Sequence, residues 1–333
     1  MAEIFRTLGI ESSCDDTCIA VVENGTTVLS SVISSQIPVH SEYGGVVPEL
    51  ASREHVKNIR TVYRQAMEEA DKTIHDIDLI GATVGPGLLG SLLVGLSFAK
   101  ALSFSSGVPL IPLNHIESHI QSAFIEFGNA IRFPAAAFVA SGGHTHLFRI
   151  DEDRSLSLLA RTRDDAVGEA FDKLSKMMGL GYPGGPVIDK LAETGDEHRY
   201  PLPRPRMSDR SLDMSFSGIK TAMFRLIREE EDALDKSGLA ASFQKTVADI
   251  LIDRIKRFEK ETPFESVILA GGVSANSYLR KRFHAAFRER TFIPSMKYAT
   301  DNGAMVASLA WIKRKEASAP LHQEAFSTWI LQS

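Results

Sequence analysis

Residues 4–22, IFRTLGIESSCDDTCIAVV, decide the fold of this chain. Apolar and β-branched side chains predict a strand over 4–10, the polar run 11–17 predicts a turn, and 18–22 predict a second strand. Asn24-Gly25 then predicts a tight turn into a third strand over 27–34. The chain therefore begins with a hairpin that presents small polar side chains at its bend.

The same arrangement recurs near the middle of the chain. The pattern predicts a strand over 135–140, the turn Ser141-Gly142-Gly143-His144-Thr145 and a strand over 146–150. After each hairpin, short apolar runs alternate with helical patterns, as in the α/β units of a mixed sheet. We therefore expect an α/β protein of two similar lobes with mixed sheets and a cleft between them. The first lobe is expected at 1–130 and the second at 131–333, with the last helix, 301–315, packing back on the first lobe.

Composition and charge limit the classes of protein that fit. The chain has 333 residues, 44% hydrophobic and 24% charged, as in soluble globular proteins. Its net charge of -5 excludes a protein that binds nucleic acid with its whole surface, so any such contact must be local. The two cysteines, Cys14 and Cys18, favour a reducing cytoplasm. Residues 1–6 carry no signal-peptide pattern, the apolar run 88–104 is interpreted as a buried helix, and we expect no membrane contact.

Two histidines four positions apart follow a predicted strand. The apolar run 108–113 ends at Asn114, a good N-cap, so His115 and His119 fall on one face of a helix. Such a pair can supply half of a metal site, and equally one histidine can cap or pack while the other is solvated. Glu117 lies about half a turn from each histidine, which argues against the H-E-x-x-H arrangement of zinc peptidases.

Glycine pairs stand at three turns of the second lobe. Exposed backbone N–H groups at such turns suit phosphate or carboxylate ligands. The turns are Ser141-Gly142-Gly143, Pro183-Gly184-Gly185-Pro186 and Gly271-Gly272-Val273-Ser274, with Asn276 just inside the helix that follows the last. The P-loop and Rossmann glycine patterns are absent from the sequence, so those two nucleotide-binding classes fit poorly.

Acidic side chains flank the second of these turns. An amphipathic helix is predicted over 163–180, with Asp164, Asp165 and Glu169 on a solvated acidic face. Asp172, on the same helix, could accept a hydrogen bond from a ribose. Asp189, beyond the turn, could do likewise or could simply favour the first turn of its helix.

Taken together, these motifs resemble those of the universal tRNA N6-adenosine threonylcarbamoyltransferase family in its bacterial form, a branch of the actin-like and sugar-kinase-like ATPase superfamily. The resemblance spans nearly the full chain, in family order, and implies two actin-like, ribonuclease-H-like lobes. The motifs that carry it are GIESSCDDT (9–17), PELASREH (48–55), GPGL (85–88), the segment with His115 and His119, SGGHT (141–145), GEAFDK (168–173), YPGGP (182–186), SFSGIK (215–220), GGVSAN (271–276) and DNGAM (301–305).

The resemblance also implies the residues of the site. It implies one divalent metal, iron or zinc, held by His115, His119 and Asp301, and two imidazoles with one carboxylate leave coordination positions open for a ligand. Asp15 matches a carboxylate expected to act in catalysis. An adenylate, threonylcarbamoyl-AMP or ATP/ADP, is expected beside Val139, Ala140, Ser141, Gly142, Gly143, Asp172, Gly185, Asp189 and Asn276. The chain departs from the family at two places, with Ser118 where glycine is common and Ala140 where valine is common.

The activity implied is transfer of a threonylcarbamoyl group from threonylcarbamoyl-AMP to N6 of the adenosine beside the anticodon of tRNAs that read codons beginning with A. Positioning the amine and stabilising the developing oxyanion should lower most of the barrier. The implied partners are tRNA, an inactive paralogue and a small ATPase in the cytoplasm. Two arginine-rich stretches, 199–210 and 280–290, could contact tRNA phosphates or be solvated faces balanced by acids.

Three alternatives to this activity remain. An actin-like kinase or chaperone-like ATPase would place carboxylates around nucleotide-bound magnesium and would not need the set of His115, His119 and Asp301. A metallopeptidase is disfavoured by the position of Glu117. A non-enzymatic scaffold would keep tRNA modification intact when His115 is replaced.

Overall fold

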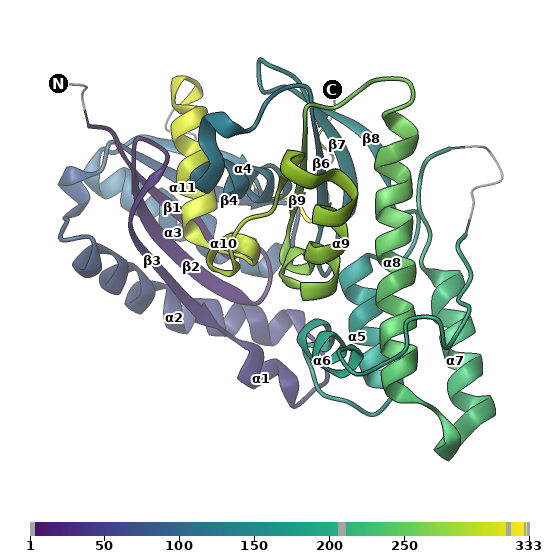
Figure 1. Cartoon of the computed structure of the whole chain (residues 1–333). Helices are drawn as coiled ribbons and strands as arrows, with labels where there is room; N and C mark the ends of the chain where they lie inside the picture. Colours follow the sequence, from purple (N-terminus) through teal and green to yellow (C-terminus); the bar gives the residue numbers. More distant parts are fainter. Residues whose placement is uncertain (1–3, 206–210, 318–320, 330, 332–333) are drawn as a thin grey trace. The chain divides into compact units, whose positions relative to one another are not determined.

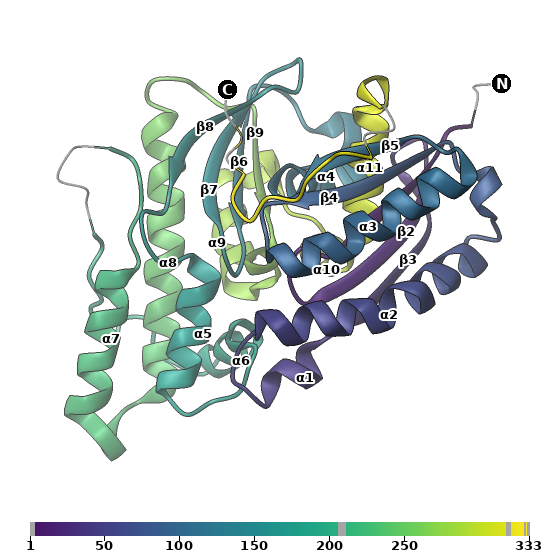
Figure 2. The ribbon, with the colours of Figure 1, turned by 180° about the vertical axis from the view of Figure 1, so that it is seen from behind.

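The structure is a computed structural model that describes residues 4–205, 211–317, 321–329 and 331. It divides into two compact units, residues 1–129 with 301–330 and residues 130–300 with 331–333. Each unit contains a five-stranded sheet with parallel and antiparallel pairs, covered by helices (Figure 1; Figure 2). The α/β class and the mixed sheets expected from the sequence are therefore confirmed.

The first unit has the strand order β3-β2-β1-β4-β5. The hairpin expected at the N-terminus is present, because β1 (Arg6–Glu11) pairs antiparallel with β2 (Asp16–Glu23), and β2 with β3 (Thr27–Ser35). Strand β4 (Leu79–Gly85) lies parallel to β1, and β5 (Leu110–Asn114) lies parallel to β4. The carboxyl ends of three parallel strands therefore meet at one edge, where ligand sites of such sheets are found.

Helices cover both faces of this sheet. On one face, α2 (Pro48–Glu69) and α3 (Leu89–Ser106) pack with strand residues such as Leu8 and Ile80 in one apolar cluster. On the other face, α11 (Gly303–Ile312) packs on residues such as Leu79 and Ile111, and α4 (His115–Phe127) lies beside it. Alternate side chains of a strand face opposite ways, so Leu79 and Ile80 belong to different clusters. Helix α1 (Ile37–Ser41) follows β3.

Glycines allow α11 to approach the sheet closely. A Cβ atom added to Gly9 of β1 would lie 2.2 Å from the Gly303 carbonyl oxygen and 2.4 Å from the Ala307 nitrogen. A Cβ atom on Gly303 would lie 2.5 Å from the backbone nitrogen of Ala20 on β2. Only glycine fits at such distances, so these two positions seat the C-terminal helix, and with it Asp301, against the N-terminal hairpin.

One helix of the described residues, α3, is long and apolar enough to cross a membrane. About a third of its residues are buried in the protein, all on the face towards α2 and β4. The interpretation of this run as a buried helix is therefore correct for one face only, because Leu89, Leu93 and Phe104 are exposed.

The second unit repeats the plan with the strand order β10-β9-β6-β7-β8. Strands β6 (Ala135–Ala140), β7 (Thr145–Ile150) and β8 (Leu156–Arg161) form an antiparallel meander. On the other side of β6, β9 (Ser266–Ala270) and β10 (Thr291–Phe292) run parallel to it. The helices of this unit are α5 (Val167–Met177), α6 (Gly184–Ala192), α7 (Ser217–Glu230), α8 (Lys236–Phe258), α9 (Ser277–Phe287) and α10 (Met296–Ala299).

Helices α5, α9 and α11 start later than the sequence predicts, and α5 and α11 also end earlier, at Met177 and Ile312. Helix α5 begins at Val167, not at 163, because the Asp164 carboxylate accepts hydrogen bonds from the Phe216 N–H (2.8 Å) and the Ser217 hydroxyl (2.7 Å) at the start of α7. Asp165 likewise pairs with a lysine, Lys173 (2.8 Å), so neither aspartate is on a solvated helix face. Asn276 is the N-cap of α9 and lies outside it, after a 3₁₀ turn over Gly272–Ala275. The last helix starts at Gly303, which leaves Asp301 in the preceding loop.

Candidate functional site

The structure brings together His115, His119 and Asp301 in the first unit. One ligand atom from each lies within 4.8 Å of the others. His119 Nε2 is 3.0 Å and His115 Nε2 is 3.7 Å from Oδ1 of Asp301, and the two rings meet edge to face at 4.6 Å. Both histidines are buried. The i, i+4 spacing thus places two imidazoles on one face of α4, as expected from the sequence.

Helix caps and side-chain pairs fix this geometry. The Asn114 side chain accepts hydrogen bonds from the N–H groups of Ile116 (2.8 Å) and Glu117 (3.2 Å), which confirms it as the N-cap of α4. Asn302 caps α11 in the same way, directly after Asp301. Between the helices, the Gln121 amide donates to the Ser308 hydroxyl at 3.0 Å. The two helices are therefore held in register beside the three candidate ligands.

Glu117 also joins the two helices, through Lys313. Its carboxylate lies 2.8 Å from Lys313 Nζ. Burial raises the pKa of Glu117, and Lys313 opposes that rise. A carboxylate engaged in this ion pair is not placed as the base of a metallopeptidase, so that alternative loses its remaining support.

The donor set fits a metal ion. Neither ring nitrogen of the buried His119 makes a hydrogen bond among the described residues, although Nε2 is 3.0 Å from Asp301. Buried polar atoms are normally satisfied, so the exception calls for another partner. Two imidazole nitrogens and a carboxylate oxygen are typical ligands of zinc and of non-haem iron. These three side chains could therefore hold a divalent metal.

Glu11, predicted in a polar turn, is a fully buried residue at the end of β1. Its Oε2 lies 3.0 Å from His115 Nδ1, and the Ser13 hydroxyl lies 3.1 Å from the same nitrogen. Burial opposes protonation of His115, but the carboxylates of Glu11 and Asp301 raise its pKa to about 9. The sequence signal that could have found it is its position directly after the predicted strand, which the structure extends by one residue to Glu11.

Asp15 lies in the turn between β1 and β2, also in the first unit. Buried His55 holds this turn, since its ring nitrogens lie 2.7 Å from the Thr17 hydroxyl and 3.0 Å from the Cys14 carbonyl oxygen. Burial raises the pKa of Asp15, and the Asp301 carboxylate raises it further. The same causes raise the pKa of Asp16 to about 7, and this second carboxylate was not singled out from the sequence.

In the second unit, the Ser141-Gly142-Gly143 turn follows β6. Gly142 and Gly143 are exposed, whereas the side chains of Val139 and Ala140 are buried and leave only backbone for a ligand. The Gly168 N–H, at the start of α5, donates to the Ser141 carbonyl oxygen at 3.1 Å. The turn over Gly271–Ala275 lies beside it, because a Cβ on Gly271 would be 2.5 Å from the Ala140 carbonyl oxygen. Two glycine turns therefore meet at the carboxyl ends of β6 and β9.

The polar side chains expected around an adenylate have structural partners. Asp172 accepts a hydrogen bond from the Gly184 N–H (2.7 Å) at the start of α6. Asp189 accepts hydrogen bonds from the N–H (2.8 Å) and hydroxyl (3.0 Å) of Ser277. Asn276 accepts one from the Leu279 N–H (2.9 Å). These bonds connect α5 to α6 and α6 to α9, while space is open around Gly185, where an added Cβ would meet no atom within 4 Å.

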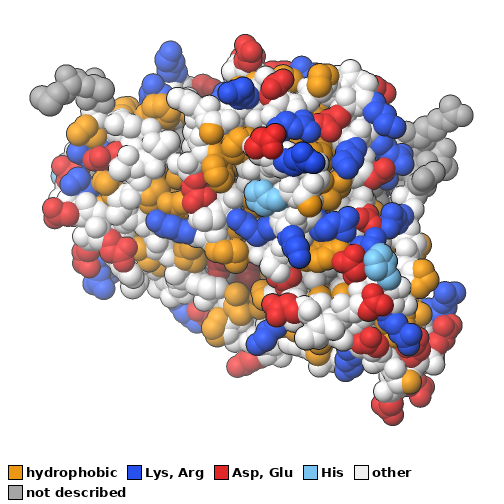
Figure 3. All heavy atoms as spheres, in the orientation of Figure 1, with side chains coloured by type: hydrophobic (Ala, Val, Ile, Leu, Met, Phe, Trp, Pro, Cys, Tyr) orange, Lys and Arg blue, Asp and Glu red, His pale blue; other side chains and the backbone are white. Residues whose placement is uncertain are grey.

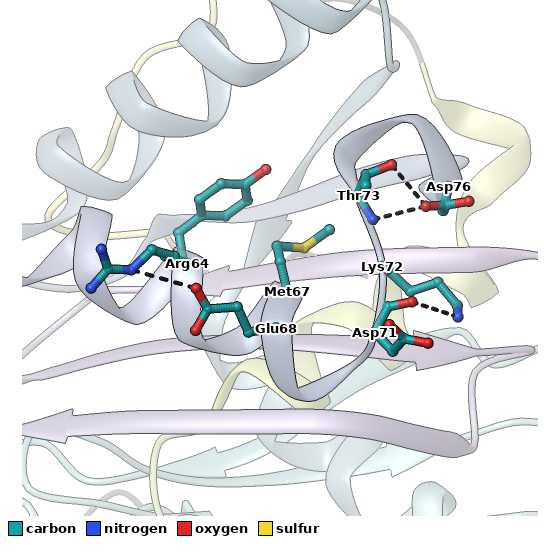
Figure 4. A pocket seen from close by; sticks show the side chains of 8 residues that line it. Arg64, Met67, Glu68, Asp71, Lys72, Thr73 and Asp76 are labelled. Atoms are coloured by element: carbon teal, nitrogen blue, oxygen red, sulfur yellow. Dashed lines mark hydrogen bonds and ion pairs between the residues drawn. The ribbon is translucent and has the colours of Figure 1, made fainter.

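A shallow depression lies at the end of α2, and none of the candidate residues lines it (Figure 4). Tyr63, Met67 and the loop to Asp76 line it. Its polar groups are paired with one another, as Asp76 is with the Thr73 hydroxyl and N–H at 2.8 Å. The depression contains no candidate ligand or nucleophile expected from the sequence, and we assign it no role.

Comparisons with solved structures show the fold. The (R)-2-hydroxyglutaryl-CoA dehydratase component A of Acidaminococcus fermentans is 14% identical, with a TM-score of 0.56 over 93% of this chain and 99% of that chain. A full-length HypF is 17% identical, with a TM-score of 0.61 over 97% of this chain and 47% of that chain. These neighbours have the actin-like ATPase fold, which confirms the architecture implied by the resemblance.

Sequence comparisons identify the family. The model of the tRNA N6-adenosine threonylcarbamoyltransferase family matches residues 27–308. The enzyme of that name from Fusobacterium nucleatum is 48% identical over 93% of this chain and 92% of its own length. The one from Thermodesulfovibrio yellowstonii is 49% identical over 92% and 93%. With the histidine pair, the hairpin turn and the glycine turns all present in the folded chain, the protein belongs to the tRNA N6-adenosine threonylcarbamoyltransferase family.

Proposed function

We propose that this protein transfers a threonylcarbamoyl group from threonylcarbamoyl-AMP to N6 of the adenosine at position 37, beside the anticodon, in tRNAs that read codons beginning with A. Family membership supports a transferase that modifies tRNA. The observation that carries the chemistry is the buried group of His115, His119 and Asp301, with ring nitrogens of His119 that lack a hydrogen-bond partner among the described residues. An ATPase or peptidase activity is not favoured.

The proposed metal ligands are His115, His119 and Asp301, with one iron or zinc ion per chain. When bound, such an ion supplies Lewis-acid polarisation of a ligand oxygen and can orient the substrate. The protein contributes a rigid frame for this group, since α4 and α11 are both capped and linked to one another. Burial of the histidines excludes water from one side of the group, which strengthens its electrostatic interactions.

The adenylate is proposed to bind to the second unit. Exposed N–H groups at Gly142 and Gly143 and the start of α6 near Gly185 suit a phosphate or an AMP leaving group. Val139, Ala140 and Ser141 would contribute backbone, and Asp172, Asp189 and Asn276 would face the nucleoside. The hydrogen bonds of these three side chains to the starts of α6 and α9 support a role in holding the turns in place.

Asp15 is the proposed acceptor of the proton that N6 of adenosine loses as the new C–N bond forms. A carboxylate whose pKa is raised towards neutrality is a better base for this step than an ordinary one. We expect Asp15→Asn to lower the rate of transfer at least about 100-fold, a typical contribution of general base catalysis, with little change in tRNA affinity. An undiminished rate would remove Asp15 from the chemistry, and Asp16→Asn tests the neighbouring carboxylate in the same assay.

Contacts with tRNA phosphates are proposed for one face of α9. Lys281, His284 and Arg288 are exposed there and form no ion pair with the described residues, and Figure 3 shows Lys and Arg side chains gathered over this region. The neighbouring arginines are engaged, as Arg282 is with Asp249 (2.6 Å) and Arg290 with Glu259 (2.7 Å). The other arginine-rich stretch, 199–210, gives less support for a tRNA contact. Arg204 also pairs with Asp249, and residues 206–210 lie outside the described part of the chain.

An inactive paralogue and a small ATPase are the proposed protein partners, with the complex in the cytoplasm, where tRNA is modified. The exposed apolar side chains of α2 and α3 support a protein contact on this side of the first unit. Val56 is 65% and Phe104 79% exposed, with Leu89 and Leu93 between 46% and 48%. Apolar residues concentrated on packed helices are typical of such interfaces.

Mass spectrometry of nucleosides tests the proposed function. Unmodified tRNA is incubated with threonine, bicarbonate, ATP and the partner proteins, with and without this chain. We expect N6-threonylcarbamoyladenosine only when the chain is present, and not when His115→Ala replaces it. Modification that continues with His115→Ala would contradict the role of the metal group and favour a scaffold function.

A further inference from the structure

The environment of His115 extends the proposed metal site by one more residue. Glu11 is fully buried, and three polar groups surround its carboxylate. Its Oε1 accepts a hydrogen bond from the Ser13 N–H at 2.6 Å. Its Oε2 accepts one from the Thr83 hydroxyl at 2.6 Å and lies 3.0 Å from His115 Nδ1. The carboxylate is thus held at once from the turn between β1 and β2, from β4 and from α4.

This arrangement fixes the proton on one nitrogen of His115. A carboxylate with two donors already on it can only accept from the imidazole, so in the neutral ring that a metal requires, Nδ1 carries the hydrogen and donates it. The lone pair of Nε2, on the opposite side of the ring, then points towards the side where Asp301 lies, 3.7 Å away. Metal-binding histidines are commonly oriented in this way by a carboxylate behind the ring.

His119 has no such support. Among the described residues, neither ring nitrogen has a hydrogen-bond partner; Nε2 has only the Asp301 carboxylate, itself a proposed metal ligand, 3.0 Å away. Of the two histidines, only His115 therefore has a carboxylate behind its ring that fixes its orientation and tautomer. We infer that Glu11 is a positioning residue of the metal site, which sets the His115 tautomer so that Nε2 can bind the ion; this inference rests on the proposed metal group.

Glu11→Gln is a sharp test because an amide cannot satisfy all three neighbours. If the amide oxygen faces the Ser13 N–H, its NH₂ group faces His115, and Nδ1 must accept. The proton then moves to Nε2 and removes the lone pair needed for the metal. If the amide is turned round, its NH₂ group faces the Ser13 N–H, donor against donor. Either orientation weakens metal binding.

The experiment measures Zn²⁺ affinity of the full chain by competition with a chromophoric chelator. We expect Glu11→Gln to lower the affinity about 10- to 100-fold, as is usual for such partners of metal ligands. Ser13→Ala is the matched control, because it removes the hydroxyl 3.1 Å from Nδ1 and keeps the N–H that binds Glu11; its affinity should stay within about threefold of wild type. A loss with Ser13→Ala and none with Glu11→Gln would overturn the inference.

A second measurement reads the wild-type chain, so it does not depend on whether Glu11→Gln folds. In the zinc-loaded chain labelled with ¹⁵N-histidine, the His115 signal, identified by its absence in His115→Ala, should show hydrogen on Nδ1 and metal on Nε2. Hydrogen on Nε2 would overturn the inference while the metal site stands. Failure of wild type to bind zinc and iron would overturn the proposed metal group itself, together with this inference.

Discussion

Replacing Gly9 by alanine should separate α11 from the first sheet. The added Cβ would lie 2.2 Å from one backbone atom of α11 and 2.4 Å from another, whereas ordinary contacts begin at 3.4 Å. The helix must therefore retreat by about 1 Å, because backbone atoms cannot rotate away as a flexible side chain does. Overpacking of a core typically costs about 1–3 kcal/mol, and because both close contacts are with backbone atoms of α11, we expect Gly9→Ala to cost about 3 kcal/mol.

The expected result is a lower melting temperature and weaker metal binding together. For a unit of this size, a loss of about 3 kcal/mol lowers Tm by about 6–12 °C, measured by calorimetry. Asp301 precedes α11 by two residues, so the same retreat moves its carboxylate away from His119. Metal ligands tolerate about 0.2 Å of displacement, so the Zn²⁺ affinity should fall about tenfold or more.

Gly218→Ala is the matched control for this substitution. Gly218 lies in the first turn of α7, and an added Cβ would meet its first neighbour, Pro205, at an ordinary 3.5 Å. Like Gly9→Ala, Gly218→Ala reduces the backbone freedom of the unfolded chain. Without a clash, this change should leave the free energy of unfolding unchanged or raise it by about 0.4–1 kcal/mol. If Gly9→Ala melts within about 2 °C of wild type and binds zinc equally well, the close approach does not hold the site together.

Two further predictions concern the second unit. Burial and the Arg161 charge lower the pKa of His146 to about 4; the unfolded chain therefore binds more protons between that value and about 6.5, and stability is lost as the pH falls through this window. Urea unfolding should show this group removing about 2 kcal/mol between pH 7 and pH 5, and His146→Gln should reduce the pH dependence by that amount. Equal pH dependence in the two proteins would mean that the fold does not lower the pKa of His146. Charge reversal of Lys281 and Arg288 together should raise the KM for tRNA and reduce the slope of log affinity against log salt by about 2, with kcat unchanged. Reversal of Arg228, on the acidic end of α7, is the control, and an equal effect there would refute a specific phosphate contact on α9.

Local patterns predicted the strands and the histidine helix well. The alternation in 4–22, the Asn24-Gly25 turn and the Asn114 cap act over a few residues, and the structure contains β1, β2, β3 and the capped helix α4. The predictions that failed depend on contacts with residues that are distant in the sequence. Asp164 leaves the predicted helix because its carboxylate binds residues about fifty positions further along the chain, and no local pattern records that partner.

The candidate site was predictable in part. Spacing alone placed His115 and His119 on one face but could not supply Asp301, which came from the family resemblance and joins them through the packing of α11. Glu11 was missed because a glutamate beside two serines looks like a turn, and only the tertiary structure encloses it behind His115. Asp172, Asp189 and Asn276 were expected to face a ligand, and their helix-end partners became visible only in three dimensions.

The membership of α11 in the first unit has a consequence for synthesis. The ribosome makes His119 long before Asp301, 182 residues later, so at about 5–20 residues per second roughly 10–35 s pass between them. During that interval the nascent first unit lacks the helix that covers Leu79, Ile111 and Leu113. A product truncated before Gly303 would keep both imidazoles yet leave this apolar face bare, open to chaperones and proteases.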